Sequence, residues 1–194
     1  LRLSFGLDKE ELFKKLIKPL MKSGYIKNYW WSKTRKGDLT INGLQLVNFI
    51  SKHCNRDNKK IIPPWLFNES EKNISSFLKG LFSAEGSVMI RNGAPIIKYN
   101  SIDENYINNV RKLLYRIGIS HSVFEETNPN TYKTKNKIYS TGSFSKYVLI
   151  KNKECFNEKI GFLLERKNKR ANIKTNSLQK KNIKNFEFDL QGVR

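Results

Sequence analysis

Between residues 68 and 87, hydrophobic positions recur at steps of three and four, which predicts an amphipathic helix. Asn68 is a favourable residue for the start of that helix, with Glu71 three residues later as in a capping box. Gly86 is a natural end. The apolar positions of the segment are Ile74, Phe77, Leu78, Leu81 and Phe82.

Two small residues share one stripe of this helix. Gly80 and Ala84 are four residues apart and therefore lie on the same face. A glycine inside a helix costs about 1 kcal/mol relative to alanine, so a compensating contact is expected. We predict that a second helix packs closely against this stripe.

The last turn of the same helix contains an acidic residue, Glu85. A carboxylate at this end faces the negative pole of the helix dipole, which is unfavourable by about 0.3–1 kcal/mol unless a positive charge lies beside it. A bound metal ion and a neighbouring lysine would each supply that charge. The sequence therefore predicts a cation next to Glu85.

A helix signal occurs once in each half of the chain. Asp8 and Asp103 each begin a stretch with an apolar stripe that is closed by glycine. Residues 39–43 and 138–142 each suggest a strand that ends in glycine, with helices expected at 44–53 and 144–150. A period of about 100 residues is too long for a solenoid and indicates a duplicated domain.

Residues 87–91 and 96–100 read as an antiparallel hairpin around Asn92-Gly93. Alternation predicts one face directed to the core and one lined with hydrogen-bond donors. The expected core residues are Val88, Ile90, Ile97 and Tyr99, and the expected donors are Arg91, Lys98 and Asn100.

The net charge of the chain indicates what it binds. There are 37 Lys plus Arg against 17 Asp plus Glu, a formal net charge of +20 on 194 residues. A polyanionic partner is expected. The alternative is a solvated lysine-rich surface that reflects an AT-rich genome.

Other classes of protein are disfavoured. No stretch approaches 18 uninterrupted apolar residues and the N-terminus lacks the order of a secretion signal, so we expect an intracellular protein. Cys54 and Cys155, with only His53 and His121 besides, give neither a disulfide framework nor zinc-ligand spacing.

Residues 78–86, Leu-Lys-Gly-Leu-Phe-Ser-Ala-Glu-Gly, resemble the signature helix of the LAGLIDADG homing endonucleases. The resemblance implies that Gly80 and Ala84 form a helix interface and that Glu85 binds Mg²⁺ or another divalent cation at a DNA cleavage site. It departs at Ser83, where the family usually has Asp. Lys167 resembles a lysine near the family's cleavage site, with Lys59-Lys60 as its counterpart in the first repeat; for both, an ordinary phosphate-contacting or solvated lysine is an equally good interpretation.

The resemblance covers about residues 1 to 175 and implies an α+β fold of two αββαββα repeats with saddle-like antiparallel sheets. The first repeat, residues 1–67, lacks its own motif helix, which would come from an upstream segment or a second chain. The second repeat spans residues 68–174. Residues 175–194 form a basic extension, in which residues 186–190 weakly resemble a strand of inteins.

The implied function is a metal-dependent double-strand break at a long, specific site in double-stranded DNA. The alternative is a catalytically inactive nucleic-acid-binding module, or an RNA splicing helper, on the same fold. The residues we expect to contact DNA are Arg2, Lys33, Arg35, Lys36, Arg91, Lys98, Asn100, Lys133, Lys135, Lys137, Lys169 and Arg170.

Overall fold

The computed structural model describes residues 1–4, 8–56, 59–125, 131–133, 138–140 and 146–173. These residues form an α+β fold with two hydrophobic clusters, one in each half of the chain, as the sequence predicted. None of the described helices is long and apolar enough to cross a membrane.

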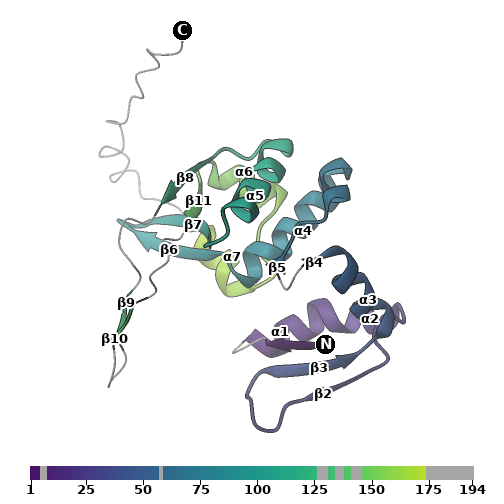
Figure 1. Cartoon of the computed structure of the whole chain (residues 1–194). Helices are drawn as coiled ribbons and strands as arrows, with labels where there is room; N and C mark the ends of the chain where they lie inside the picture. The colour runs from purple at the N-terminus through teal and green to yellow at the C-terminus, as the bar shows by residue number, and fades with distance from the viewer. Residues whose placement is uncertain (5–7, 57–58, 126–130, 134–137, 141–145, 174–194) are drawn as a thin grey trace, which may run out of the picture.

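The first unit is a helical rod packed on a three-stranded antiparallel sheet (Figure 1). Its strands are β1 (Arg2–Ser4), β2 (Asn28–Trp31) and β3 (Asp38–Asn42), in the order β1-β3-β2. The rod is continuous through α1 (Lys9–Leu12), the π-helical segment η2 (Phe13–Ile17) and α2 (Lys18–Lys22). The buried side chains between rod and sheet are Ile17, Ile26, Leu39 and Ile41.

A short hairpin and a 3-10 helix connect the units after helix α3 (Leu44–His53). Strands β4 (Asn55–Arg56) and β5 (Lys59–Lys60) pair with each other, and the 3-10 helix η3 (Pro64–Asn68) follows. Ile62 and Leu66 of this connection are buried in the core of the second unit. The predicted boundary at residue 67 therefore follows residues that already belong to the second core.

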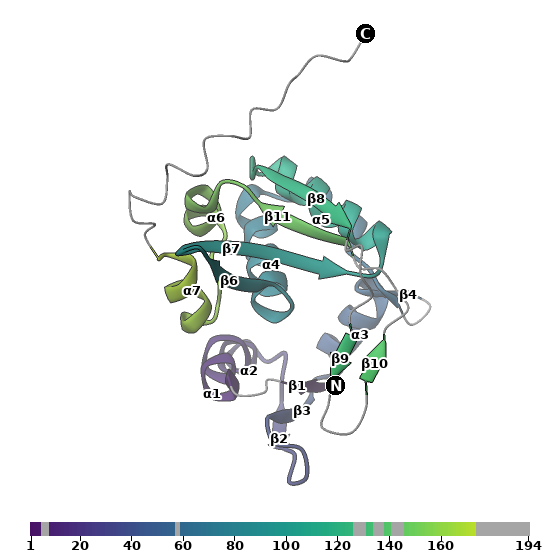
Figure 2. The same ribbon diagram turned by 90° about the vertical axis from the view of Figure 1, so that its left-hand side faces the viewer.

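The second unit has a four-stranded antiparallel sheet in the order β6-β7-β11-β8. Figure 2 shows this sheet in front of α4 and α5. The strands are β6 (Ser87–Arg91), β7 (Ala94–Ser101), β8 (His121–Glu125) and β11 (Lys146–Ile150). The helices are α4 (Glu71–Ala84), α5 (Glu104–Arg116), α6 (Lys153–Lys159) and α7 (Glu165–Ala171). A separate hairpin joins β9 (Thr131–Lys133) to β10 (Ile138–Ser140).

The hairpin predicted at residues 87–100 is present, with Asn92 and Gly93 both at positive φ in its turn. Val88, Ile97 and Tyr99 are buried as expected. Ile90 is 44% exposed, so its assignment to the core was wrong. Ile90 shares the face of Val88 by alternation, but it lies next to the hairpin turn, where it pairs with Pro95.

The strand order supports the predicted duplication. The order β1-β3-β2 of the first unit corresponds to β7-β11-β8 of the second, and each set leads into a helix, α3 or α6. The match of residues 39–43 with 138–142 was wrong, because the counterpart of β3 is β11 and residues 146–150 form a strand rather than a helix. The β9-β10 hairpin is an insertion before β11. Because of it, residues 39–43 were matched to the inserted β10 instead of to β11.

The two units are joined by polar contacts between Asp8 and the helical rod that follows it in the first unit, and the residues around α7 in the second. Arg166 binds Asp8 through two nitrogens, with Nη2 2.7 Å from Oδ2. Lys15 donates to the carbonyl of Leu163 at 2.6 Å. Asp8 makes no helix-capping hydrogen bond, whereas Asp103 caps α5 by accepting from the Tyr106 N–H at 3.0 Å. The predicted cap at Asp8 is thus replaced by a contact between the units.

Helix α4 is capped by Ser70, whose side chain accepts from the Asn73 N–H, so the predicted cap at Asn68 was two residues too early. At the other end, Gly86 is required by close packing. A Cβ atom added there would lie 2.6 Å from the Phe82 carbonyl oxygen and 2.9 Å from its Cα. A Cβ added at Gly80 would meet nothing within 4 Å.

Gly86→Ala should lower the free energy of unfolding by about 1–3 kcal/mol, because backbone atoms must move to admit the methyl group. Gly80→Ala is the matched control: it should leave stability unchanged or raise it by up to about 1 kcal/mol through helix propensity. Chemical denaturation followed by circular dichroism measures both. Equal stability of Gly86→Ala and the parent would contradict this packing.

Candidate active site at the end of the motif helix

Helix α4 holds its C-terminal end in place through a fully buried apolar face. Ile74, Leu78 and Phe82 have no exposed surface, and the Phe82 ring packs against Phe156 with centroids 5.0 Å apart. Gly80 and Ala84 lie on another side of the helix, which borders a groove. The helix end is therefore fixed by the core while one stripe stays accessible.

Glu85 follows α4 directly and is 40% exposed at its side chain. Its Oε2 accepts a hydrogen bond from the Tyr99 hydroxyl at 2.8 Å, and its Oε1 forms an ion pair with Lys60. Partial burial alone would raise the pKa of Glu85, but the bonds from Lys60 and Tyr99 outweigh it and hold the pKa below its usual value. The carboxylate is ionised at neutral pH. The sequence predicted either a metal ion or a lysine beside Glu85, and the structure shows a lysine, Lys60.

Tyr99 fixes this carboxylate from the core side. It is 1% exposed, and burial raises the pKa of its hydroxyl, with Tyr106 and Glu85 adding to the effect. The hydroxyl therefore stays protonated and can only donate to Glu85. Tyr99 on β7 thus holds one oxygen of the Glu85 carboxylate, and the other oxygen faces Lys60.

Lys167 is 8% exposed and binds the end of α4 rather than the carboxylate. Its ammonium donates to the carbonyl oxygens of Ser83 at 2.6 Å, Gly86 at 2.6 Å and Phe82 at 3.2 Å. The three N–H groups of the ammonium are thus matched by three carbonyl acceptors, and its positive charge lies at the negative pole of the α4 dipole. Burial, and then the neighbouring Arg166, lower the pKa of Lys167 to about 8.

Ser83 occupies the position where the resemblance would place Asp, and it is buried. Its hydroxyl donates to the Lys79 carbonyl at 2.6 Å and accepts from the Leu163 N–H at 2.7 Å. The hydroxyl joins α4 to the segment before α7. A small neutral side chain serves this purpose without placing a second carboxylate in the core.

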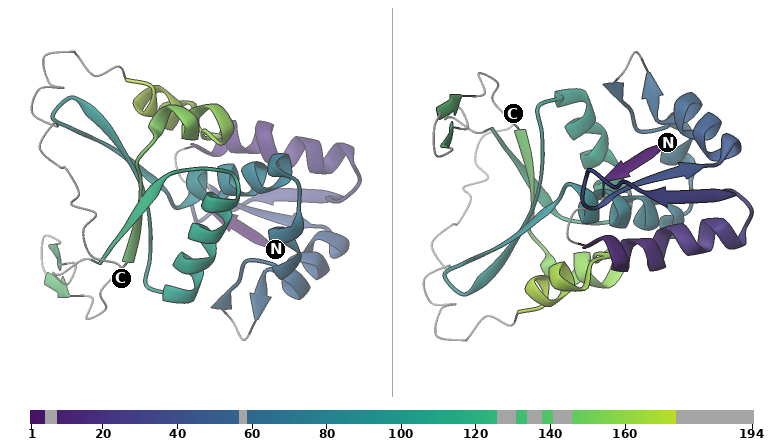
Figure 3. Two further views of the ribbon diagram at one scale, coloured as in Figure 1. Left: turned by 90° about the horizontal axis from the view of Figure 1, so that it is seen from above. Right: turned by 90° about the horizontal axis from the view of Figure 1, so that it is seen from below.

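A groove of about 870 Å³ runs beside the accessible stripe of α4. Figures 1 and 3 show α4 between the four-stranded sheet and the first unit. The groove is lined by both apolar and charged side chains. Its lining includes Leu12, Leu16, Gly80, Ala84, Leu163 and Leu164, with Asp8, Glu85 and Arg166.

Residues 72–161 match the family model described as a LAGLIDADG-like domain. This part of the chain belongs to that family. The match includes the motif helix α4, the carboxylate of Glu85 and the whole four-stranded sheet. The resemblance drawn from residues 78–86 is therefore confirmed.

Curated relatives match the chain along its length. The chain is 44% identical over 196 residues to a DNA polymerase of Thermococcus litoralis, covering 100% of this chain and 11% of that protein. It is 42% identical over 190 residues to a DNA polymerase of Thermococcus hydrothermalis, covering 97% of this chain and 11% of that protein. The chain thus spans about a ninth of the length of these relatives.

The predicted DNA-contacting residues of the second unit that the structure describes fall into two groups. Arg91, Lys98 and Asn100 lie on the face of the four-stranded sheet that is turned away from the helices. Lys169 and Arg170 are exposed on α7, where Lys169 pairs with Glu165 at 2.9 Å. The structure does not describe Lys135, Lys137 or the side chain of Lys133. The predicted strand at residues 186–190 also falls outside the described residues.

In the first unit, Arg2 lies 3.5 Å from Asp38 across β1 and β3. Lys33, Arg35 and Lys36 are exposed in the connection between β2 and β3. None of these four basic side chains lines the groove beside Glu85. They belong to the surface of the first sheet and its turn.

The partners of Glu85 were only partly foreseen. Lys60 appeared in the sequence only as a counterpart of Lys167, with no contact assigned to it, and Tyr99 was expected as core without a polar role. Twenty-five residues separate Lys60 from Glu85, and the hydrogen bond between them depends on how β5 is folded back. The demand for a positive charge at the helix end was the one signal that pointed to such a residue.

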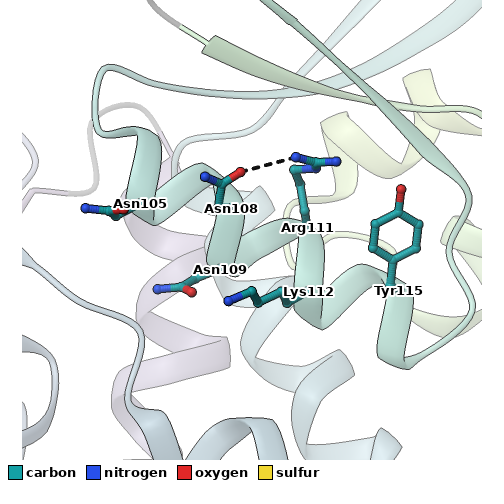
Figure 4. A pocket seen from close by; sticks show the side chains of 6 residues that line it. All are labelled: Asn105, Asn108, Asn109, Arg111, Lys112 and Tyr115. Carbon is teal, nitrogen blue, oxygen red and sulfur yellow. Dashed lines mark hydrogen bonds between the residues drawn. The ribbon is translucent and has the colours of Figure 1, made fainter.

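A second depression of about 470 Å³ lies along α5 and is separate from the groove (Figure 4). Its lining is polar and basic, and Asn108 accepts a hydrogen bond from Arg111 at 3.2 Å. Among the described residues, it shares no lining residue with the groove beside Glu85. Its lining residues are Asn105, Asn108, Asn109, Arg111, Lys112 and Tyr115.

Lys167→Met should lower the free energy of unfolding by about 1–3 kcal/mol, because three carbonyls at the end of α4 then lose a charged donor. Lys169→Met is the matched control, since Lys169 is 75% exposed on the same helix and should change stability by less than about 0.5 kcal/mol. Urea denaturation of the three proteins measures the difference. If both substitutions had the same effect, Lys167 would not stabilise the end of α4.

Proposed function

We propose that this chain is the DNA-cleaving part of a homing endonuclease that makes a metal-dependent double-strand break at a long, specific site. The observation that carries the proposal is Glu85, an ionised and accessible carboxylate held at the end of the motif helix, beside an open groove. The family match and the net charge of +20 support it. The matches to DNA polymerases suggest that the endonuclease is encoded within such a gene, as an intein.

The residues present fit a hard divalent cation such as Mg²⁺. The described part of the chain has no cluster of three or more His, Cys, Asp or Glu side chains, and we propose Glu85, the accessible carboxylate at the end of α4, as the ligand. Mg²⁺ is commonly held by one or two carboxylates together with waters and substrate phosphates. When bound there, the ion would lower the pKa of a water and stabilise charge on the scissile phosphate.

The other side chains of the site have distinct tasks in phosphodiester hydrolysis. Tyr99 holds the Glu85 carboxylate in one orientation, and Lys60 brings a positive charge that can bind a phosphate oxygen. Lys167 was expected as a catalytic residue. Because its ammonium group donates its hydrogen bonds to the carbonyls at the end of α4, we assign Lys167 the role of positioning Glu85.

We further propose that the groove beside Gly80 and Ala84 receives the motif helix that the first unit lacks. In the described residues that unit begins at β1, the counterpart of β7, with no element equivalent to α4 or β6. The bare stripe of α4 and the leucines opposite it form a surface that a second helix would cover. Such a helix would come from an upstream segment of a longer protein or from a second copy, and it would bring the second carboxylate to the cleavage site.

Glu85→Gln should reduce cleavage by about 100-fold or more while leaving DNA affinity nearly unchanged, because the amide keeps the shape but not the charge of the metal ligand. The measurement is plasmid linearisation with Mg²⁺, using the native full-length protein and the polymerase gene locus without the insert. Glu71→Gln is the matched control, since Glu71 lies at the opposite end of the same helix and pairs with Lys159. It should cut like the parent.

Two results would redirect the assignment. Binding of the duplex without cleavage by the parent protein would indicate a nucleic-acid-binding module. Preference for folded RNA over duplex DNA would indicate a splicing helper. Either would contradict the endonuclease.

Gly80→Leu tests the helix interface. Because an added Cβ would meet no atom within 4 Å outside the backbone of its own helix, the second unit should fold without loss of stability, yet the leucine should block a helix from approaching α4. We expect cleavage by the full-length protein to fall at least about tenfold, with the melting temperature of this unit unchanged. Undiminished cleavage would show that the groove stays open during the reaction.

A further inference from the structure

The face of the four-stranded sheet that is turned away from the helices carries more apolar side chains than the sequence predicted. We call it the outer face. Its positions alternate with the buried ones along each strand. Its apolar members are Met89 on β6, Ile96 on β7, Tyr147 and Leu149 on β11, and Phe124 on β8.

These side chains are neighbours across the strands. Met89 pairs directly with Ile96, and Tyr147 pairs with Phe124. Leu149 is opposite Lys98, diagonal to Ile96, and so links the two pairs. Met89 is 45% exposed and Phe124 is 42% exposed. A contiguous apolar patch of this kind on a sheet surface indicates a contact with a partner.

Cations are interspersed in the same patch. Arg91 lies beyond Met89 on β6, and the Lys98 ammonium lies 5.0 Å from the centre of the Tyr147 ring. The Tyr147 ring in turn stacks on Phe124, with centroids 5.4 Å apart. The partner must therefore offer negative charge and small apolar groups within a few ångströms of each other.

We propose that the outer face of the second sheet reads the 5-methyl groups of thymine in the major groove of the half-site that this unit contacts. The proposal rests on the proposed function. Major-groove edges offer the thymine methyl as their apolar group, and phosphates line both sides of the groove. The β6-β7 hairpin, in which Met89 pairs with Ile96, is a two-stranded antiparallel ribbon of the kind that fits the width of that groove. Met89, Ile96 and Leu149 contact methyl groups, while Arg91 and Lys98 bind phosphates or guanine.

The test removes the methyl group and nothing else. Duplexes recovered from a random-sequence pool by the native full-length protein define the half-site, and each thymine in it is then replaced by deoxyuridine. Binding should weaken about fourfold for each methyl that the outer face contacts. Deoxyuridine in the flanking duplex should have no effect.

Met89→Thr and Ile90→Thr supply the matched protein variants. The two residues are adjacent and equally exposed, at 45% and 44%, but alternate between opposite faces of β6. Met89→Thr should weaken binding of the thymine duplex and abolish the loss at one deoxyuridine position. Ile90→Thr should retain the parent's pattern at every position.

Equal affinity for the thymine and fully deoxyuridine half-sites, with site-specific binding intact, would overturn the proposal. Unchanged DNA affinity in Met89→Thr would likewise overturn it and point to a protein surface as the partner of the patch. Absence of any specific duplex from the pool would instead refute the proposed function. The two failures are thus distinguishable.

Discussion

The Lys167 ammonium at the end of α4 is the interaction on which the site depends. A helix that must place a carboxylate at its C-terminal end works against its own dipole, and the free carbonyls there add further negative potential. The protein meets this with two lysines that do separate work. Lys167 neutralises the carbonyls from the buried side, and Lys60 pairs with the Glu85 carboxylate from the solvent side.

The position of Lys167 ties the helix end to the contact between the units. The residue beside it, Arg166, binds Asp8 of the first unit, and Leu163 of the same segment donates to Ser83 of α4. One short stretch around α7 thus fixes the motif helix, the wall of the groove and the first unit together. Leu163 and Arg166 of this stretch also line the groove.

The sequence predicted the features that depend on local pattern and failed where distant residues decide. The motif helix, its small-residue stripe and the hairpin with Asn92-Gly93 follow from periodicity and turn chemistry. Asp8 looks like Asp103 in sequence, but its cap is lost to Arg166, which comes from the other half of the chain. The second strand match was displaced by an insertion, and the apolar character of the outer face became visible only when the register placed Met89 beside Ile96.

The duplication explains why Lys60 lies where it does. Lys167 follows α6 at the end of its unit, and Lys60 follows α3, the counterpart of α6. In the second unit this lysine binds the end of its own motif helix. The equivalent helix end of the first unit would lie next to Glu85 if two motif helices pack side by side in the groove. The pairing of Lys60 with Glu85 agrees with the internal symmetry that the proposed second motif helix would complete.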